Sequence, residues 1–342
     1  MRAVDRPAVT VLDCTLRDGG YYNDWAFDDV LVESYLAACA EVGVDVVELG
    51  YAGPGDAGRG PYGRLPDGFP PHLAAALSGD RGTRLAVMVD AGPLLGDRAA
   101  EAGSRLAERL ATGPLPIDLV RIAVNHARTA ETGALVEAVR SAGFGVCLNL
   151  MQIDLADGDR LARAVDAVAG MAPLEAVYIA DSLGSMSAER IAALVERFRA
   201  GQDAPVGIHA HDNQGFALHN TLAAADAGAT WLDATVLGMG RGAGNTRTEQ
   251  LLAALGTPPD RLRPLLETAA RRFTTLLDKY RWGANPLYAL AGMDRVHPSY
   301  VQCLEQTTEH SLDVKLRVLR SLAAVGANAF SAGRLETALR DG

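Results

Sequence analysis

The sequence lacks paired cysteines and long apolar runs. Its four cysteines, Cys14, Cys39, Cys147 and Cys303, are scattered, and no two of them form a C-x-x-C pair. This spacing indicates free thiols of a cytoplasmic protein rather than disulfides or a zinc site. No apolar run is long enough to cross a bilayer, and the first residues lack the apolar stretch of a signal peptide. We therefore expect a cytoplasmic protein without a membrane segment.

Basic residues are also scarce. The chain has 32 Lys and Arg against 42 Asp and Glu, which gives a formal net charge of −10. A nucleic-acid surface needs clustered basic residues, and an anionic lipid surface attracts positive charge, so both kinds of partner are disfavoured. Apolar residues make up 49% of the 342 residues, enough for a sizeable core in one large domain or two ordinary ones.

Short apolar segments recur along the first two thirds of the chain, their starts 25 to 39 residues apart. We predict eight strands, at residues 9–12, 46–49, 85–89, 119–123, 146–150, 176–180, 206–210 and 231–234. Most gaps between them have helical spacing, and we predict helices over residues 28–42, 98–112, 130–142, 159–169, 187–200 and 216–227. Strands that alternate with helices imply a parallel sheet.

Eight such units in about 250 residues match a (β/α)₈ TIM barrel, with a doubly wound sheet as the competing fold. Thr246 and Glu249 have capping-box spacing and open one more helix, which ends before Gly256. We therefore predict a catalytic barrel over residues 1–256. Residues 257–342 are helical in pattern, with a helix over 261–280, and are predicted to be a C-terminal extension that serves as a lid or an oligomer contact.

The stretch from Gly53 to Pro71 follows the second strand and contains six Gly and five Pro. This composition excludes a regular helix or strand. The stretch lies on the face where barrel active sites form, so it is either a substrate loop or a flexible insertion.

Candidate metal ligands follow two of the strands. His209 and His211 are two residues apart on an extended strand, so both side chains point to one face. Arg17 and Asp18 come just after the first strand, at the same mouth of a barrel. A carboxylate and two imidazoles suit Mg²⁺ or Mn²⁺, and Zn²⁺ takes the same ligands in catalytic sites. A surface ion pair is the alternative interpretation of Arg17 and Asp18.

A glycine-rich loop, residues 237–245 (LGMGRGAGN), follows the last strand. Its Gly-x-Gly-x-Gly-x-Gly spacing and its place in the last unit do not match a dinucleotide-binding loop. Glycines here allow close approach of the backbone to a ligand. Asn245 is either a fourth, amide ligand or a helix cap.

Together, residues 15–19 (TLRDG), Glu48, His209-Ala-His211 and the loop ending at Asn245 resemble the DRE-TIM metallolyase family over about residues 8–256. That family includes hydroxymethylglutaryl-CoA lyase, isopropylmalate and homocitrate synthases and 4-hydroxy-2-oxovalerate aldolase. The resemblance implies a divalent metal on Asp18, His209 and His211, with Asn245 as a further ligand. Mn²⁺ or Mg²⁺ is the first choice, with Zn²⁺ or Co²⁺ as alternatives. It also implies Arg17 as the residue that stabilises an enolate held on the metal, with Glu48 as its orienting neighbour.

Departures from the family patterns favour the aldolase branch. Met239 and Arg241 stand where hydroxymethylglutaryl-CoA lyases carry a cysteine, and the C-terminal extension is too short for the synthases. The aldolases have a histidine base shortly after the Arg-Asp pair, where this chain has Tyr21. A phenol with a pKa near ~10 is a poor base unless its surroundings change that value. The candidate proton carriers are Tyr21, Tyr22, Tyr288, His126 and a metal-bound water.

Other strand ends supply candidate substrate contacts. Ser182 matches the small hydroxyl that the aldolases use for the 2-oxo acid carboxylate, and Arg121, Asn149 and Gln152 are further candidates. Arg121 lies inside a strand, so pairing with a barrel carboxylate is its alternative role.

Three functions stay open. The first is a metal-dependent aldolase acting on a pyruvate-type 2-oxo acid and an aldehyde. The second is a Claisen-type carboligase using an acyl-CoA. The third is a non-catalytic barrel that partners a dehydrogenase. The sequence favours the aldolase, as a homo-oligomer and with an aldehyde dehydrogenase as a candidate partner.

Overall fold

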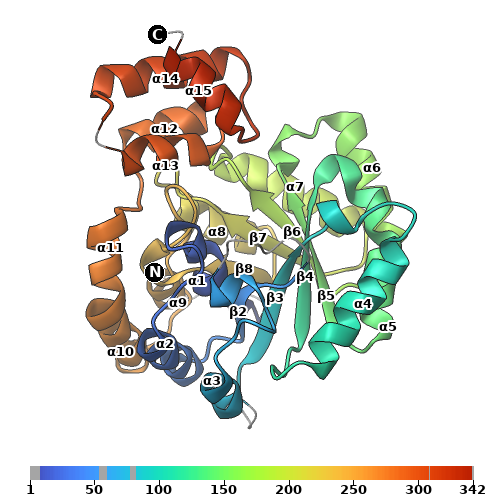
Figure 1. Ribbon diagram of the computed structural model, residues 1–342. Helices are drawn as coiled ribbons and strands as arrows, with labels where there is room; N and C mark the ends of the chain where they lie inside the picture. Colours follow the sequence, from blue (N-terminus) through green and yellow to red (C-terminus); the bar gives the residue numbers. More distant parts are fainter. Residues whose placement is uncertain (1–7, 54–59, 78–81, 308, 341–342) are drawn as a thin grey trace.

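The structure, a computed structural model, describes residues 8–53, 60–77, 82–307 and 309–340. Within them, eight parallel strands close into a barrel in which each strand pairs with the next and the last pairs with the first. The predicted (β/α)₈ fold with a helical C-terminal region is therefore confirmed (Figure 1). The strands are β1 (Thr10–Asp13), β2 (Val46–Tyr51), β3 (Arg84–Asp90), β4 (Leu119–Asn125), β5 (Gly145–Met151), β6 (Ala176–Asp181), β7 (Val206–Ala210) and β8 (Trp231–Ala234).

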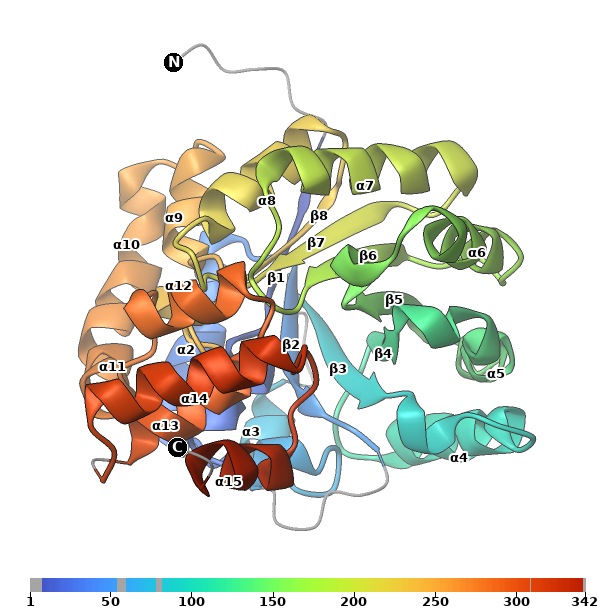
Figure 2. The ribbon, with the colours of Figure 1, turned by 90° about the horizontal axis from the view of Figure 1, so that it is seen from above.

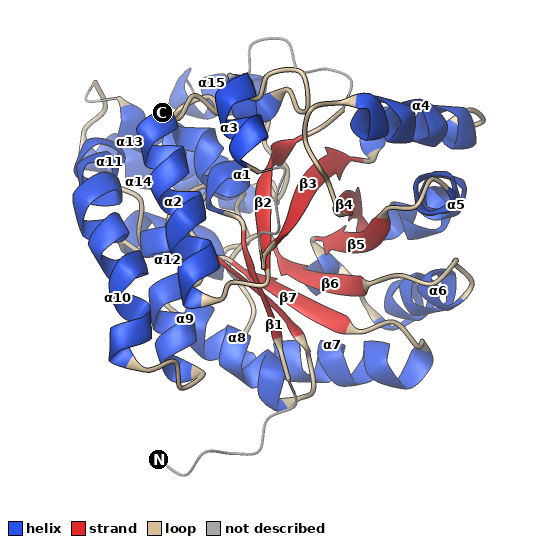
Figure 3. Cartoon of the chain, turned by 90° about the horizontal axis from the view of Figure 1, so that it is seen from below, coloured by secondary structure: helices blue, strands red, loops and turns tan. Residues whose placement is uncertain are grey.

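Helices surround the barrel (Figure 3). They are α1 (Thr15–Gly19), α2 (Asp29–Val42), α3 (Pro71–Ala76), α4 (Ala99–Thr112), α5 (Gly133–Ser141), α6 (Gly158–Ala169), α7 (Ala188–Gly201), α8 (Ala217–Asp226) and α9 (Thr248–Ala254). Helix α2 shows how the sequence fixes such boundaries. The Asp28 side chain accepts hydrogen bonds from the amides of Val30 and Leu31, and Gly43 ends the helix with φ +83°.

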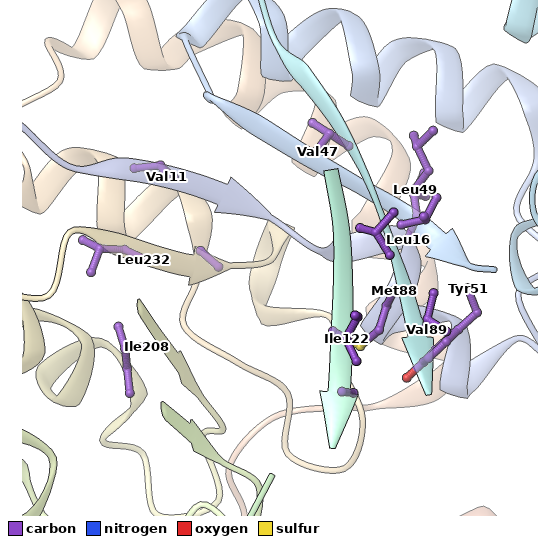
Figure 4. Packing of buried hydrophobic residues seen from close by; sticks show 14 of the residues in the cluster. Val11, Leu16, Val47, Leu49, Tyr51, Met88, Val89, Ile122, Ile208 and Leu232 are labelled. Carbon is purple, nitrogen blue, oxygen red and sulfur yellow. The ribbon is translucent and has the colours of Figure 1, made fainter. Parts of the chain in front are cut away.

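Alternation along the strands divides the core into two layers. Val11, Val47 and Leu232 belong to the layer between the strands and the helices, part of which Figure 4 shows. The opposite faces of the same strands carry Leu12, Val46 and Trp231 in a separate buried cluster inside the barrel. Because side chains two residues apart share a face, the next inward positions of β2 and β8 are Glu48 and Asp233, which are described with the site below.

Beyond α9, the chain is helical. The predicted helix over 261–280 is two helices, α10 (Pro259–Thr268) and α11 (Thr274–Tyr280), joined by a π-helical turn. Four more follow: α12 (Pro286–Met293), α13 (Pro298–Gln306), α14 (Leu312–Ala324) and α15 (Ala332–Arg340). These four share a small core that includes Ala243 of the glycine-rich loop, and they lie over one side of the barrel (Figure 2).

The structure describes part of the Gly/Pro-rich stretch. Residues 54–59 lie outside the described residues, but Tyr62, Leu65 and Phe69 are buried in the main core. None of residues 60–71 lines the pocket at the barrel mouth. No helix in the described part of the chain is long and apolar enough to cross a membrane.

Candidate metal centre and active site

A pocket of about 410 Å³ lies at the C-terminal ends of the strands, where barrel active sites form. Strand ends supply one part of its wall, including Met88, Asn149 and His209. The C-terminal region supplies another part, including His297 and Phe330. The pocket is therefore built by the barrel and its helical extension together.

Asp18, His209 and His211 meet in the floor of this pocket. One ligand atom from each lies within 4.8 Å of the others, and all three residues are buried. His209 Nε2 is 3.5 Å from Asp18 Oδ2. The two candidate metal-ligand segments, far apart in sequence, are therefore adjacent in space.

The second ring nitrogen of each histidine is held by the protein. His209 Nδ1 lies 2.9 Å from Asp233 Oδ2, and His211 Nδ1 lies 3.2 Å from the carbonyl oxygen of Gly244. Both partners only accept, so both Nδ1 atoms carry hydrogen, and Nε2 is the ring nitrogen that each histidine can offer to a cation. This carboxylate or carbonyl support is usual behind histidines that bind metals.

The two imidazoles differ in their electrostatic surroundings. Burial, and next the charge of Arg241, hold the pKa of His211 well below its usual value, which keeps the ring neutral. Burial also lowers the pKa of His209, but the neighbouring carboxylates of Asp18 and Asp233 outweigh it and raise the pKa overall. Asp18 is itself buried, yet Arg17 and the histidines hold its pKa well below the usual range, so it is a carboxylate.

Two buried oxygens at this point have no hydrogen-bond partner within the described residues: Asp18 Oδ2 and Asn245 Oδ1. The Asn245 amide nitrogen lies 3.2 Å from His209 Nε2. A Cβ atom at Gly240 would lie 1.7 Å from Asn245 Oδ1 and 3.0 Å from Asp18 Oδ2, so only glycine lets the loop close over these oxygens. An unsatisfied carboxylate oxygen beside two imidazoles, with a neighbouring amide whose oxygen is also unsatisfied, is a donor set that fits a divalent cation.

A second group, Cys14, His209 and Asp233, also has metal-ligand spacing. It fits a cation less well. Burial raises the pKa of the Cys14 thiol well above its usual value, whereas a metal ligand has to be a thiolate. Asp233 is already paired with Arg121 and His209.

Arg17 lies between two carboxylates. Its Nη1 donates to Asp18 Oδ1 at 2.8 Å and its Nε to Glu48 Oε2 at 2.7 Å. These bonds fix the guanidinium in the pocket wall with Nη2 directed to neither acid. The surface ion pair considered from the sequence is wrong, because Arg17 and Asp18 are both buried.

The inward residues of the strands continue this charge pattern below the pocket. Arg121 Nη2 donates to Asp233 Oδ2 at 2.6 Å, and Arg121 Nη1 lies 3.0 Å from Glu48 Oε2. Asp233 in turn holds His209, which faces Asp18. With Arg17, these residues form a closed ring of alternating basic and acidic groups, which we call the charge ring. Each member therefore orients its two neighbours.

The predicted substrate contacts divide into two groups. Ser182, Asn149 and Gln152 line the pocket, and Asn149 Oδ1 has no partner within the described residues. The side chain of Gln152 is engaged by Asn125 and by the carbonyl of Asn328. Arg121 is fully buried and does not line the pocket; the structure shows the pairing with barrel carboxylates that was its alternative role.

The predicted proton carriers divide in the same way. Tyr21 lines the pocket, and its hydroxyl lies 3.0 Å from that of Tyr51, which also lines it. Tyr288 is buried against Tyr22, with 3.4 Å between the hydroxyls, and neither lines the pocket. His126 is buried outside the pocket lining as well.

Several residues of the site were not predicted from the sequence. Tyr51 was missed because β2 was predicted to end at Leu49, and His297 was not among the predicted site residues. Asp233 was missed although the alternation of Trp231 and Asp233 along β8 points both side chains inward, a signal that could have found it.

Comparisons with known proteins show which proteins the chain resembles. A family model described as HMGL-like matches residues 84–270. The 4-hydroxy-2-oxovalerate aldolase of Burkholderia pseudomallei (strain 668) is 31% identical over 307 residues, covering 88% of this chain and 84% of that protein. A protein named oxaloacetate decarboxylase, from Mycobacterium tuberculosis (strain ATCC 25618 / H37Rv), is 32% identical over 257 residues, covering 75% and 72%.

Solved structures give the same fold. The N-terminal domain of a putative aldolase from Bacteroides vulgatus superposes with a TM-score of 0.73 at 29% identity, covering 88% of this chain and 97% of that one. The carboxyl transferase domain of Rhizobium etli pyruvate carboxylase superposes with a TM-score of 0.70 at 15% identity, covering 97% and 60%. At that identity the second likeness shows the fold alone.

Proposed function

The chain belongs to the HMGL-like family, the DRE-TIM metallolyases, and from that premise we propose that it is a divalent-metal-dependent aldolase. It makes or cleaves a carbon–carbon bond next to the keto group of pyruvate or a related 2-oxo acid, with an aldehyde as the second reactant. The observation that carries this proposal is the buried donor set of Asp18, His209, His211 and Asn245, with Arg17 in the same pocket wall.

Asp18, His209 and His211 would hold the cation, with Asn245 as a further ligand once its amide oxygen faces the imidazoles. Amide oxygen and nitrogen positions exchange by a half-turn of the side chain, so this needs no backbone movement. When bound, the cation supplies Lewis acidity that stabilises an enolate. Oxygen and imidazole ligands favour Mn²⁺ or Mg²⁺, with Zn²⁺ or Co²⁺ as alternatives.

Arg17 stabilises the enolate oxygen in this proposal. Its charge is permanent, and its bonds to Asp18 and Glu48 fix the guanidinium before the substrate arrives. Donors held in place where negative charge develops are a major source of catalysis. Glu48 thereby acts as a positioning residue for Arg17.

Tyr21 carries the proton to or from the hydroxyl of the 4-hydroxy-2-oxo acid. Its hydroxyl reaches the pocket and bonds to that of Tyr51. Burial raises the pKa of Tyr51 well above its usual value, so Tyr51 stays protonated and can donate to a Tyr21 phenolate. Ser182 lines the pocket, and in this proposal its hydroxyl contacts the substrate.

The alternatives have less support. A carboligase needs a site for the phosphates of coenzyme A, and Arg17 and Arg241 are the only basic side chains in the described pocket wall besides histidines. A non-catalytic barrel partnering a dehydrogenase has no need of an aligned and supported donor set.

An activity panel tests the proposal. Chelator-treated protein is offered 4-hydroxy-2-oxo acids, pyruvate with aldehydes, oxaloacetate, and acyl-CoA with 2-oxo acids, each with and without added Mn²⁺. We expect Mn²⁺-dependent release or consumption of pyruvate with the hydroxy acids and aldehydes. Loss of activity in His211→Ala, with normal activity in the exposed-residue control His219→Ala, would support the assignment. Turnover confined to acyl-CoA, or no turnover, would overturn it.

A further inference from the structure

Arg241 reaches into the pocket from the glycine-rich loop. Its Nη2 donates to the carbonyl of Ser182 at 3.1 Å and lies 3.2 Å from His211 Nε2. Its Nη1 lies 3.2 Å from His297 Nε2, which belongs to the C-terminal region. The guanidinium thus spans the wall from the candidate metal centre to the helical extension.

None of these three partners is a carboxylate. Burial, followed by the charge of Arg241, lowers the pKa of His297 to about 3, so this imidazole is uncharged at neutral pH. His211 offers an imidazole nitrogen and Ser182 its backbone carbonyl. Arg241 forms no ion pair with any carboxylate in the described part of the chain.

Arg17 provides the contrast. Its charge is matched by Asp18 at 2.8 Å and Glu48 at 2.7 Å. Charged groups in enclosed sites are normally paired with an opposite charge. Of the two arginines in the pocket wall, only Arg241 therefore has its charge unmatched by the protein, and an anionic ligand would match it.

The two arginines contact different members of the donor set. Arg17 bonds to Asp18, whereas Arg241 bonds to His211. A 2-oxo acid has two neighbouring polar groups, a keto oxygen and a carboxylate. With Arg17 at the keto oxygen, as proposed above, the carboxylate is directed to the side where Arg241 and Ser182 lie.

We propose that Arg241 binds the carboxylate of the 2-oxo acid and makes the enzyme selective for 2-oxo acids over neutral ketones. This inference rests on the proposed function and deepens it. A guanidinium forms paired, charge-assisted hydrogen bonds with a carboxylate, which are stronger than bonds from a hydroxyl such as that of Ser182.

The contact between Arg241 and His211 has a second consequence. A single lone pair on Nε2 either accepts a hydrogen bond or binds a cation. Arg241 therefore competes with a divalent cation for His211 Nε2, and a bound cation frees the Arg241 donor for the substrate. Removal of Arg241 should strengthen cation binding and weaken 2-oxo acid binding. If Arg241 only supported the fold, its removal would not strengthen cation binding while it weakens 2-oxo acid binding.

The test compares Arg241→Gln and Arg241→Lys with the matched control Arg247→Gln. Arg247 carries the same charge near the end of the same loop but does not line the pocket. Titration calorimetry measures Mn²⁺ binding to metal-free protein and pyruvate binding to Mn²⁺-loaded protein, and circular dichroism checks folding.

For Arg241→Gln we expect pyruvate to bind roughly 10–100-fold more weakly, the range for losing a hydrogen bond to a charged group. Mn²⁺ should bind more tightly than it does to the wild type. Arg241→Lys should bind pyruvate with an affinity between those of the wild type and Arg241→Gln, because lysine keeps the positive charge but cannot form the paired hydrogen bonds. The control should match the wild type. Methyl pyruvate, which lacks the carboxylate charge, should bind the wild type and Arg241→Gln equally.

Other outcomes would overturn the inference. Unchanged pyruvate affinity in Arg241→Gln would remove Arg241 from the carboxylate, and a loss confined to aldehydes that carry a carboxylate would assign it to the other reactant. Unchanged or weaker Mn²⁺ binding would contradict the competition between Arg241 and the cation and would indicate a structural role. Failure of the wild type to bind any 2-oxo acid would overturn the proposed function itself, a result distinct from a failure of Arg241 alone.

Discussion

Arg121→Met tests whether the charge ring supports the site or whether Arg121 contacts substrate. Arg121 is fully buried, with Nη2 2.6 Å from Asp233 Oδ2, Nη1 3.0 Å from Glu48 Oε2, and its guanidinium over the ring of Tyr178. Methionine fills similar space without charge, so the substitution leaves two buried carboxylates short of a partner. Removal of one partner from a buried ion pair costs about 3–5 kcal/mol of folding free energy.

The assay is urea unfolding followed by circular dichroism, with pyruvate KM measured in parallel. Arg105→Met is the matched control, because Arg105 pairs with Glu101 at 2.6 Å but on the exposed face of α4. An exposed helical pair of this kind contributes about 0.3–0.5 kcal/mol. We expect a loss of free energy of unfolding several times larger for Arg121→Met than for the control. Arg121→Lys, which keeps the charge, should recover part of the stability and gives a folded variant if Arg121→Met does not fold. A stable Arg121→Met with a raised pyruvate KM would refute the reasoning and return Arg121 to the substrate.

Three further predictions concern the pocket and its rim. Arg17→Ala should lower kcat by about 10²–10³-fold, the range for losing one oxyanion donor, with bound Mn²⁺ retained by elemental analysis; a change of only a few-fold would make Arg17 a structural residue. Tyr21→Phe and Tyr51→Phe should each lower turnover with little change in thermal stability, and normal activity in both together with loss in Tyr288→Phe would move the proton carrier elsewhere. Burial raises the pKa of Asp181 from 3.8 to about 7. The folded protein therefore keeps the Asp181 carboxyl proton to higher pH than the unfolded chain does. As a result, the contribution of Asp181 to the free energy of unfolding falls as pH rises from about 4 to about 7. In chelator-treated protein, Asp181→Asn should therefore gain stability relative to the wild type from about pH 4 to pH 7, by at most about 4 kcal/mol at 1.4 kcal/mol per pKa unit; urea unfolding at both pH values showing no relative gain would contradict this.

The sequence predicted the barrel because its local signals agree. Val206–Ala210 and the other apolar segments alternate with helical spacing, and stops such as Gly43 fall where the helices end. The end of β2 could not be predicted. The register with β3 shifts between Glu48 and Tyr51, and this irregularity depends on the neighbouring strand rather than on local sequence.

The candidate site was predictable where its residues are close together in the chain. The spacing of a pair in the sequence determines where its side chains lie relative to each other. This is so for His209 and His211, and for Arg17 and Asp18. The partners of Arg121 could not be predicted in this way, because they lie on other strands and depend on how those strands are aligned in the barrel.

His297 shows a second limit. It meets Arg241 only because the C-terminal helices fold back over the barrel, and no short-range pattern reports such a path. The predicted lid or oligomer contact of this region, and a dehydrogenase partner, stay predictions.

The central claim is that Asp18, His209 and His211 hold one divalent cation on which the carbon–carbon chemistry depends. Its most direct test is the Mn²⁺ stoichiometry of purified wild type, His211→Ala and the control His219→Ala, measured by elemental analysis after equilibration with limiting Mn²⁺. We predict one Mn²⁺ per chain in the wild type and the control, and little in His211→Ala, whose circular dichroism spectrum stays that of the folded barrel. A folded His211→Ala that binds Mn²⁺ as the wild type does would contradict the account.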